Sequence, residues 1–129
     1  MSGYFDQLEV RSAADRAADL ALALPQQIAR AQGLAGYVDA LAGIDPATIA
    51  SVGDLARLPV LRKADLSAAQ GRVAPFGGYA SLPASRYAHV FQSPGPIYEP
   101  GGDGSDWWRL GRFLSACGIG AGDIVQNCF

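Results

Sequence analysis

The chain has few of the residues that build metal and disulfide sites. Its 129 residues include two cysteines and one histidine. Cys117 and Cys128 are not at CxxC spacing and have no histidine near them, so we expect two buried, reduced thiols and no metal site. His89 has no carboxylate or thiol close to it in sequence, which favours a structural histidine. No catalytic base can therefore be nominated from the sequence.

Excess charge of one sign and long hydrophobic runs are also missing. The chain has 10 Lys and Arg against 12 Asp and Glu, and no basic block follows one face, which argues against a nucleic-acid partner. No apolar run has the length of a membrane span, and no secretory leader follows Met1. We therefore expect a cytoplasmic protein with no membrane partner. Half of the residues are hydrophobic, which is enough for a packed core.

The first 86 residues are predicted to form helices joined by tight turns. Residues 12–32 are Ala-rich, and Leu20, Leu24 and Ile28 fall on one helical stripe. Pro25 has no N–H, so we expect a kink there or two separate helices. Shorter helices are expected at 34–41, from Asp45-Pro46, at 52–57 with Ser51 and Asp54 as a loose capping box, and at 62–70.

From Tyr87 the pattern changes to that of an α/β protein. We expect a strand at 87–92, a Gly-containing loop at 93–100, a helix at 106–117 and a strand at 124–129. The helix should pack on the sheet through a stripe formed by Trp107, Leu110, Leu114 and Cys117. Residues 1–86 then form one region and residues 87–129 the start of an α/β core. A final strand without a neighbour leaves backbone groups unpaired, so we expect the front part of a longer protein.

Several short segments stand in a characteristic order. They are Tyr4–Glu9, Gly43–Pro46, Asp54–Val60 with Arg62–Leu66, Pro75–Gly78, Ser93–Gly95 with Pro100, and Ala116–Gly118 before Gly122-Asp123. In order and spacing they resemble the amino-terminal region of the phenylacetate–coenzyme A ligase family, which belongs to the AMP-forming adenylating enzymes. The likeness extends over nearly the whole chain.

This resemblance implies an activity and a fold. Such enzymes use ATP and Mg²⁺ to convert a carboxylic acid to an acyl-adenylate and pass the acyl group to coenzyme A; arylacetic acids are the familiar substrates. The fold would be α/β, with a helical amino-terminal cap and the first strand–loop–helix–strand unit of the core, incomplete here. Because the family's later motifs would lie beyond Phe129, the piece alone should be inactive. An exposed strand edge would favour self-association, so a homo-oligomer is also open.

By resemblance, the phosphate-loop positions are Ser93, Gly95 and Pro100, where relatives read Ser-Ser-Gly-Thr-Thr-Gly-Lys-Pro. Pro94 and Pro96 each remove a backbone N–H, and Tyr98 replaces a glycine. Glu99 replaces the lysine, and at ~6 Å one such like-charge contact with phosphate costs about 3 kcal/mol at an effective dielectric of about 20. Three interpretations stay open: a ligase with a remodelled loop, a non-catalytic binding module on the same scaffold, and a stiff surface turn.

Weaker candidate sites each have a simpler interpretation. Glu99, Asp103 and Asp106 could bind a divalent cation, but a solvated turn with a helix cap explains them better. Arg62-Lys63 could face an anion such as coenzyme A, although a solvated surface is the more ordinary role. Four aromatic residues could line an acid pocket or simply pack in the core: Tyr79, Tyr87, Phe91 and Trp107.

Overall fold

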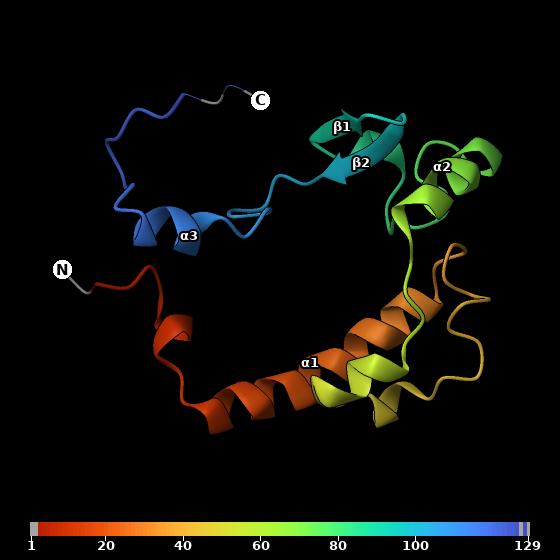
Figure 1. Cartoon of the computed structure of the whole chain (residues 1–129), viewed down its shortest axis with the longest axis horizontal. Coiled ribbons are helices and arrows are strands. Elements are labelled where there is room, and N and C mark those ends of the chain that lie inside the picture. Colours follow the sequence, from red (N-terminus) through yellow and green to blue (C-terminus); the bar gives the residue numbers. More distant parts are fainter. Residues whose placement is uncertain (1–2, 127, 129) are drawn as a thin grey trace. The chain divides into compact units, whose positions relative to one another are not determined.

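The structure is a computed structural model that describes residues 3–126 and residue 128 (Figure 1). It divides into two compact units. The terminal unit is Met1–Ser12 with Gly104–Phe129, and the central unit is Ala13–Asp103. The sequence predicted a different division, into a helical region at 1–86 and the start of an α/β core at 87–129. That division stays a prediction. Within residues 3–126, no helix combines the length and the apolar character that crossing a bilayer would take.

Helix α1 (Ala13–Gln32) opens the central unit. It continues through Pro25, so the alternative with two separate helices is wrong. Pro25 costs one backbone hydrogen bond, and the carbonyl left over belongs to an exposed turn where water can reach it. The predicted stripe is confirmed, because Leu20 and Leu24 are half-buried and Ile28 is buried.

The segment after α1 forms turns, and the helix predicted at 34–41 is wrong. Its backbone hydrogen bonds mix three- and four-residue spacings, as in Tyr37 N–H to Leu34 O and Leu41 N–H to Tyr37 O. The Gln32 side chain holds this segment, since its Nε2 donates to the carbonyls of Leu41 at 3.2 Å and Ile44 at 2.7 Å. These tertiary bonds replace the regular ladder that the local sequence would otherwise form.

Two predicted caps are confirmed on short 3₁₀ helices. In η2 (Pro46–Thr48), the carboxylate of Asp45 accepts from the N–H of Ala47 at 3.0 Å. Before η3 (Gly53–Arg57), the Asp54 N–H donates to Ser51 Oγ, and Asp54 Oδ2 accepts from the Ser51 N–H at 2.9 Å. This reciprocal pair is the predicted capping box. Its hydrogen bonds, first that from the Ser51 hydroxyl, lower the pKa of Asp54.

Helix α2 (Lys63–Arg72) follows, as predicted for 62–70, and a short η4 (Ala84–Arg86) leads into the sheet. Strand β1 (His89–Ser93) pairs with β2 (Ile97–Gly101) in an antiparallel hairpin. The predicted strand at 87–92 is thus nearly in place, but the predicted loop at 93–100 is wrong. Ser93-Pro94-Gly95-Pro96 reverses the chain, and Ile97, only 5% exposed, anchors the returning strand.

The terminal unit contains η1 (Gln7–Val10) and α3 (Gly111–Ala116). Only the second half of the predicted helix 106–117 forms, because Asp106 and Arg109 have left-handed φ values of 52° and 55°. The predicted stripe is also wrong: Trp107, Leu110 and Cys117 are exposed, and Leu114 is half-buried. Of the predicted strand 124–129, residues 124–126 and 128 form none, and Asn127 and Phe129 lie outside the described residues.

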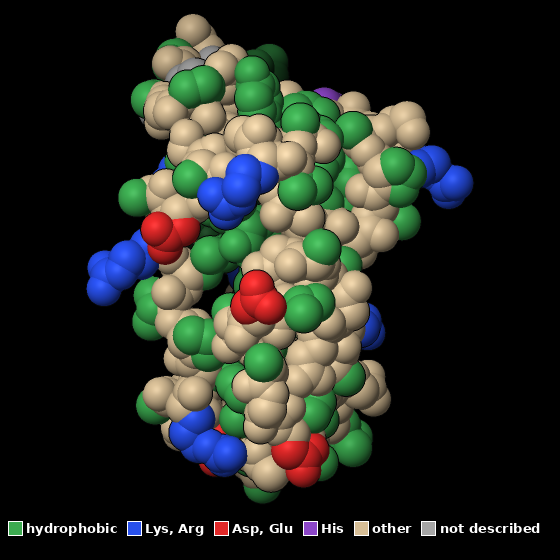
Figure 2. Space-filling view, turned by 90° about the vertical axis from the view of Figure 1, so that its right-hand side faces the viewer, with side chains coloured by type: hydrophobic (Ala, Val, Ile, Leu, Met, Phe, Trp, Pro, Cys, Tyr) green, Lys and Arg blue, Asp and Glu red, His purple; other side chains and the backbone are tan. Residues whose placement is uncertain are grey.

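The buried core of the described residues is small. Its hydrophobic members are Ile28, Leu41, Ile49, Ala69, Phe76 and Ile97, with Ile49 fully enclosed. Many other large hydrophobic side chains are exposed, and Figure 2 shows such groups spread between the charged ones on the face in view. Cys117 and Cys128 are free thiols as predicted, but both are exposed, so the prediction that they are buried is wrong.

Candidate functional site

The hairpin turn between β1 and β2 contains two of the three predicted phosphate-loop positions. Ser93 ends β1 opposite Ile97, and Gly95 occupies the turn with a φ of 132°. Pro100 lies further along β2, opposite Val90, so the structure does not bring it to the turn. The expected strand–loop–helix crossover is therefore an antiparallel hairpin in the described chain.

The turn has few donors for an anion. Between Ser93 and Ile97, only Gly95 contributes an N–H, because Pro94 and Pro96 have none. The Ser93 hydroxyl donates to the carbonyl of Ile97 at 3.4 Å, which is a long contact. A phosphate cradle depends on several convergent N–H groups, so this turn alone is a weak one.

Strand β2 is held from the side opposite β1 by Gln70 of α2. Gln70 Nε2 donates to the Tyr98 carbonyl at 2.8 Å, and the Tyr98 N–H donates to Gln70 Oε1 at 2.9 Å. The side-chain amide thus pairs with both backbone groups of one strand residue, as a neighbouring strand would. Gln70 is 9% exposed and its polar atoms are satisfied. Sequence analysis missed this residue, because a lone glutamine in a helix gives no signal.

Two cavities lie next to each other in the central unit and share Tyr37, Leu61 and Tyr79. The larger, of about 410 Å³, lies among α1, the 36–41 turns and the extended 58–61 segment, and Asp65 and Gln27 are its polar members. The smaller, of about 170 Å³, reaches β2 at Glu99 and Pro100. Apolar walls with a few polar groups are typical of small-molecule sites.

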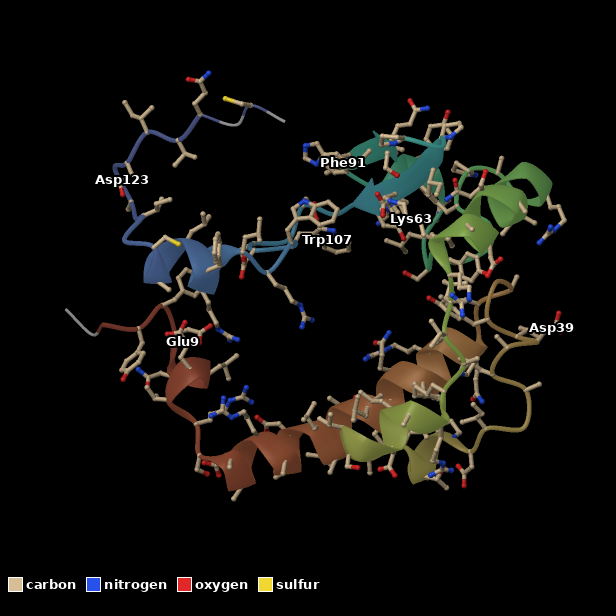
Figure 3. The ribbon with its side chains drawn as sticks, viewed as in Figure 1. Glu9, Asp39, Lys63, Phe91, Trp107 and Asp123 are labelled. Atoms are coloured by element: carbon tan, nitrogen blue, oxygen red, sulfur yellow. The ribbon has the colours of Figure 1, made fainter. Side chains whose placement is uncertain are left out.

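The four aromatic candidates have different surroundings in the structure. Tyr79 lines both cavities and packs edge-on against Tyr37, with ring centroids 4.9 Å apart. Tyr87 packs instead against Phe76, and Phe91 stacks on His89 at 5.8 Å on the exposed face of β1. Trp107 belongs to the terminal unit (Figure 3). Of the four residues, Tyr79 lies on the walls of these two cavities.

Two glycines explain why the 36–37 and 77–79 segments can touch. The Gly36 N–H donates to the Gly78 carbonyl at 3.0 Å. A Cβ on Gly36 would lie 2.5 Å from the Tyr79 ring, and one on Gly78 would lie 2.9 Å from Gly36 N. Gly77 and Gly78 both have left-handed φ values, of 67° and 80°. This contact places Tyr79 on the cavity wall.

The predicted charged candidates have ordinary structural roles. No group of three or more metal-binding side chains occurs among residues 3–126 and 128. Asp106 Oδ1 accepts from the Gly111 N–H at 2.8 Å, so this carboxylate holds the first residue of α3, although the N-cap position is Leu110. Arg62 and Lys63, at the start of α2, are exposed to solvent.

An ion pair in the terminal unit joins the two ends of the chain. Asp6 accepts from Arg112 in a bidentate arrangement, with Nη2 to Oδ2 at 2.9 Å, and Asp6 Oδ1 also accepts from the Leu8 N–H. The hydrogen bond from Arg112 is the main cause that lowers the pKa of Asp6, and the same bond raises the pKa of Arg112. Because the partners are 106 residues apart in sequence, no local pattern could reveal the pair.

Crystal structures of 2-hydroxyisobutyryl-CoA ligase resemble this chain in sequence and fold. An open conformation in complex with 2-HIB-AMP and CoA is 32% identical, with a TM-score of 0.62 over 70% of this chain and 21% of that one. A postadenylation state with R3-HIB-AMP is 30% identical, with a TM-score of 0.63 over 70% and 20%. A postadenylation state with 2-HIB-AMP is 31% identical, with a TM-score of 0.70 over 86% and 25%. These matches support the adenylate-forming family.

The similarity to these ligases covers only part of their length. The chain spans about a fifth to a quarter of the length of those ligase chains. No protein-family model and no curated protein sequence matches it. The described residues form a small mixed helix-and-sheet structure that matches part of an adenylating-enzyme fold. The phenylacetate subtype, which the sequence segments resembled, stays a prediction.

Proposed function

We propose that this chain is the amino-terminal part of an AMP-forming acyl-CoA ligase. One observation carries the proposal: 30–32% identity to 2-hydroxyisobutyryl-CoA ligase over 70–86% of the chain. In the whole enzyme, a carboxylic acid would react with ATP and Mg²⁺ to give an acyl-adenylate, and coenzyme A would take the acyl group. The chain by itself would not complete this reaction, and a cytoplasmic location is part of the proposal.

The identity of the carboxylic acid is the next question for this proposal. The ligase structures contain the adenylate of a branched hydroxy acid, whereas the sequence segments resemble a family that acts on arylacetic acids. The central cavities are mainly apolar, and Tyr37 and Tyr79 contribute aromatic surface. Such walls accommodate either kind of acid. We propose 2-hydroxyisobutyrate and phenylacetate as the first two acids to test.

Pyrophosphate exchange tests the reaction directly. The full-length protein that carries this chain should exchange labelled pyrophosphate into ATP when Mg²⁺ and the right acid are present. The panel should include short hydroxy acids and aryl acids, with a no-acid control. No exchange with any acid, together with a melting temperature that ATP and Mg²⁺ leave unchanged, would refute the proposal.

The predicted phosphate-loop positions can be tested in the same protein. Ser93→Ala removes the one hydroxyl of the 93–97 turn, and Ser67→Ala on α2 is a matched control that is exposed and far from the turn in sequence. If Ser93 binds phosphate, its loss should raise the KM for ATP by about fivefold, equivalent to one neutral hydrogen bond of about 1 kcal/mol. Equal KM values for ATP in the two variants would show that Ser93 does not bind phosphate.

The donor-poor turn favours a second candidate from another class. A scaffold that keeps the fold but lacks convergent N–H groups at 94–96 can bind a ligand or partner without adenylation. If the chain belongs to such a binding module, an acid should raise the melting temperature in the absence of ATP, and pyrophosphate exchange should stay at background. Acid-dependent exchange would exclude it.

A further inference from the structure

The β1–β2 hairpin is a two-stranded sheet, so each strand has an outer edge that the other strand does not cover. Facing residues of an antiparallel pair either turn their N–H and C=O groups toward each other or turn them all away. Because Gln70 bonds the Tyr98 N–H and carbonyl from the side opposite β1, Tyr98 and its partner Gln92 belong to the second kind. The next pair of this kind, two residues along, is Val90 with Pro100.

The outer edge of β2 offers little to another strand. Its Tyr98 groups are engaged by Gln70, and Pro100 has no N–H. Helix α2 also lies beside β2 (Figure 1). Side-chain bonds, proline and a neighbouring helix are common means by which proteins protect a strand edge. An added strand would therefore find few groups to bond on this side of the hairpin.

The outer edge of β1 has none of these protections. Val90 and Gln92 turn their N–H and C=O groups outward, and within residues 3–126 and 128 these groups have no hydrogen-bond partner. The strand contains no proline and no Lys, Arg, Asp or Glu, and its residues are exposed except for the half-buried Ser93. An uncharged, exposed edge of this kind is open to pairing with another strand.

We propose that β1 is an interface with a second copy of this chain, in which the two β1 strands pair antiparallel with Phe91 at the centre. The two hairpins then form one four-stranded sheet about a twofold axis, and because both open edges are covered, assembly stops at a dimer. Such a sheet is also more stable than the two-stranded hairpin of one copy. The edge of β1 favours a second copy as its partner because the edge is complementary to itself.

The register follows from which main-chain groups point outward. With Phe91 at the centre, Val90 of each copy exchanges two hydrogen bonds with Gln92 of the other, so every outward group of both strands is used. A pairing centred on Gln92 would set Val90 opposite Pro94, which has no N–H. One centred on Val90 would set Gln92 opposite Ala88, which lies outside β1. A shift by one residue would bring groups that already bond β2 to the interface.

The side chains and charges of the hairpin are compatible with this pairing. Glu99 is the one acidic or basic side chain of residues 89–101 other than His89, and it lies on β2. The two copies of Glu99 would be about 14 Å apart at a strand spacing of about 4.8 Å, beyond the Debye length of about 8 Å at physiological salt. The Phe91 ring stacks on His89 and lies over Gly101, where a Cβ would be 2.7 Å from Phe91 Cε2. The ring thus keeps its place within the hairpin, and main-chain bonds provide the attraction.

Cysteine cross-linking of the full chain tests the register. In a Cys117→Ser, Cys128→Ser background, two Phe91→Cys side chains would face each other with Cα atoms about 4.5 Å apart, within the disulfide range of about 4.4–6.8 Å. Mild oxidation should convert most of this variant to a covalent dimer. Gln92→Cys is the matched control, since it is exposed on the same strand but its Cα would lie about 7–8 Å from its counterpart, too far for a disulfide.

A second variant tests the hydrogen bonds and leaves Phe91 in place. Val90→Pro removes an N–H that points away from β2, so the hairpin should persist while each copy loses one bond to the other. The dimer dissociation constant, from sedimentation equilibrium, should rise about tenfold or more. Val90→Thr keeps the N–H and a β-branched side chain and should change this constant by less than about threefold. An unchanged melting temperature of Val90→Pro in dilute, monomeric samples checks that the variant folds.

Amide hydrogen exchange shows what covers the edge. The Val90 and Gln92 amides should exchange fast in the dilute monomer and slowly in the dimer. Slow exchange in the monomer would overturn the proposal, because another segment of the same molecule would then cover β1. So would a wild type that stays monomeric at every concentration, equal cross-linking of the Phe91 and Gln92 variants, or equal dissociation constants for the two Val90 variants. None of these measurements depends on the proposed ligase activity, so a failed exchange of pyrophosphate leaves this test intact.

Discussion

At the scale of single residues, the perturbed carboxylates each have an identifiable partner. Asp54 is engaged by Ser51 within the same turn, and Asp6 by Arg112 from the other end of the chain. Both carboxylates have a pKa below the ordinary value of 3.8. A carboxylate with a lowered pKa stabilises the fold above its unfolded pKa, and the stabilisation is lost as the pH falls through the folded value.

The ion pair gives a pH-dependent prediction. Asp6→Asn keeps an oxygen that can accept from the Leu8 N–H but removes the charge that Arg112 meets. The variant should melt at a lower temperature than the wild type at pH 7. The difference should begin to shrink as the pH falls below 3.8, the ordinary pKa of the unfolded carboxyl, and should be lost as the pH falls through the lowered pKa of folded Asp6.

Asp39→Asn serves as the control for this change, because Asp39 is an exposed carboxylate of the central unit. Its melting temperature at pH 7 should match that of the wild type. Salt at about 0.5 M should also reduce the effect of Asp6→Asn, since both partners are partly exposed and screened. A melting difference that is the same at pH 7 and pH 3 would contradict an electrostatic origin.

Glycine substitutions provide the second residue-scale prediction. Gly78→Ala would need a left-handed alanine whose Cβ meets Gly36 N at 2.9 Å, so we expect a loss of at least about 1–2 kcal/mol in unfolding free energy. Gly71→Ala is the control. Gly71 lies in α2 with open space around it, so the substitution should raise the unfolding free energy by about 0.5–1 kcal/mol. Urea unfolding of both variants measures the difference, and two equal stabilities would refute the close contact.

At the scale of elements, the hairpin depends on support from α2. The β1–β2 pair has two strands only, and an isolated two-stranded hairpin is marginally stable in water. Gln70 supplies hydrogen bonds on the free side of β2, and Ile97 supplies buried apolar surface. The hairpin and α2 therefore form one structural unit, although 28 residues separate Gln70 from Tyr98.

Gln70→Ala should loosen this unit. The variant leaves the Tyr98 N–H and carbonyl without their partner, at an expected cost of about 1–3 kcal/mol. Amide hydrogen exchange of Tyr98 should become faster, while amides of α1 keep their protection. Ser67→Ala, an exposed change on the same helix, should stay within about 0.5 kcal/mol of the wild type. Unchanged Tyr98 exchange in Gln70→Ala would show that the amide does not hold β2.

Elements held by interactions between sequence neighbours could be predicted. Elements held by residues far apart in sequence could not. The Ser51–Asp54 capping box and the Asp45 cap depend on neighbours within three residues, and both are confirmed. The 34–41 segment was mispredicted because Gln32 and Gly78 supply its hydrogen bonds. The hairpin was mispredicted because the resemblance favoured a loop, whereas the buried Ile97 and the pairing with β1 favour a strand.

At the scale of the whole molecule, apolar surface is the main feature. Exposed large hydrophobic residues far outnumber the buried ones in the described chain, and several lie on the hairpin: Val90, Phe91 and Tyr98. Large exposed apolar areas mark surfaces that contact other protein. In the proposed ligase, the rest of the enzyme would cover part of this surface.

The isolated chain should therefore self-associate. Light scattering during size exclusion should give a mass above the 13.4 kDa of one chain, because the free edge of β1 and the exposed apolar groups can pair between copies. Val90→Lys places a charge on β1 and should shift the population towards 13.4 kDa. Val52→Lys, on an exposed position outside the sheet, should have a smaller effect. A monodisperse wild-type monomer would contradict the prediction.

The amino-acid sequence alone determined the helical character of the first region, the buried stripe of α1, two caps and the likeness to acid-activating ligases, since these depend on neighbouring residues or on the order of segments. Tertiary structure decided the hairpin, the Gln70 support and the Asp6–Arg112 pair. The physical reason is distance along the chain: a hydrogen bond or ion pair between residues 28 or 106 positions apart leaves no periodic trace in sequence.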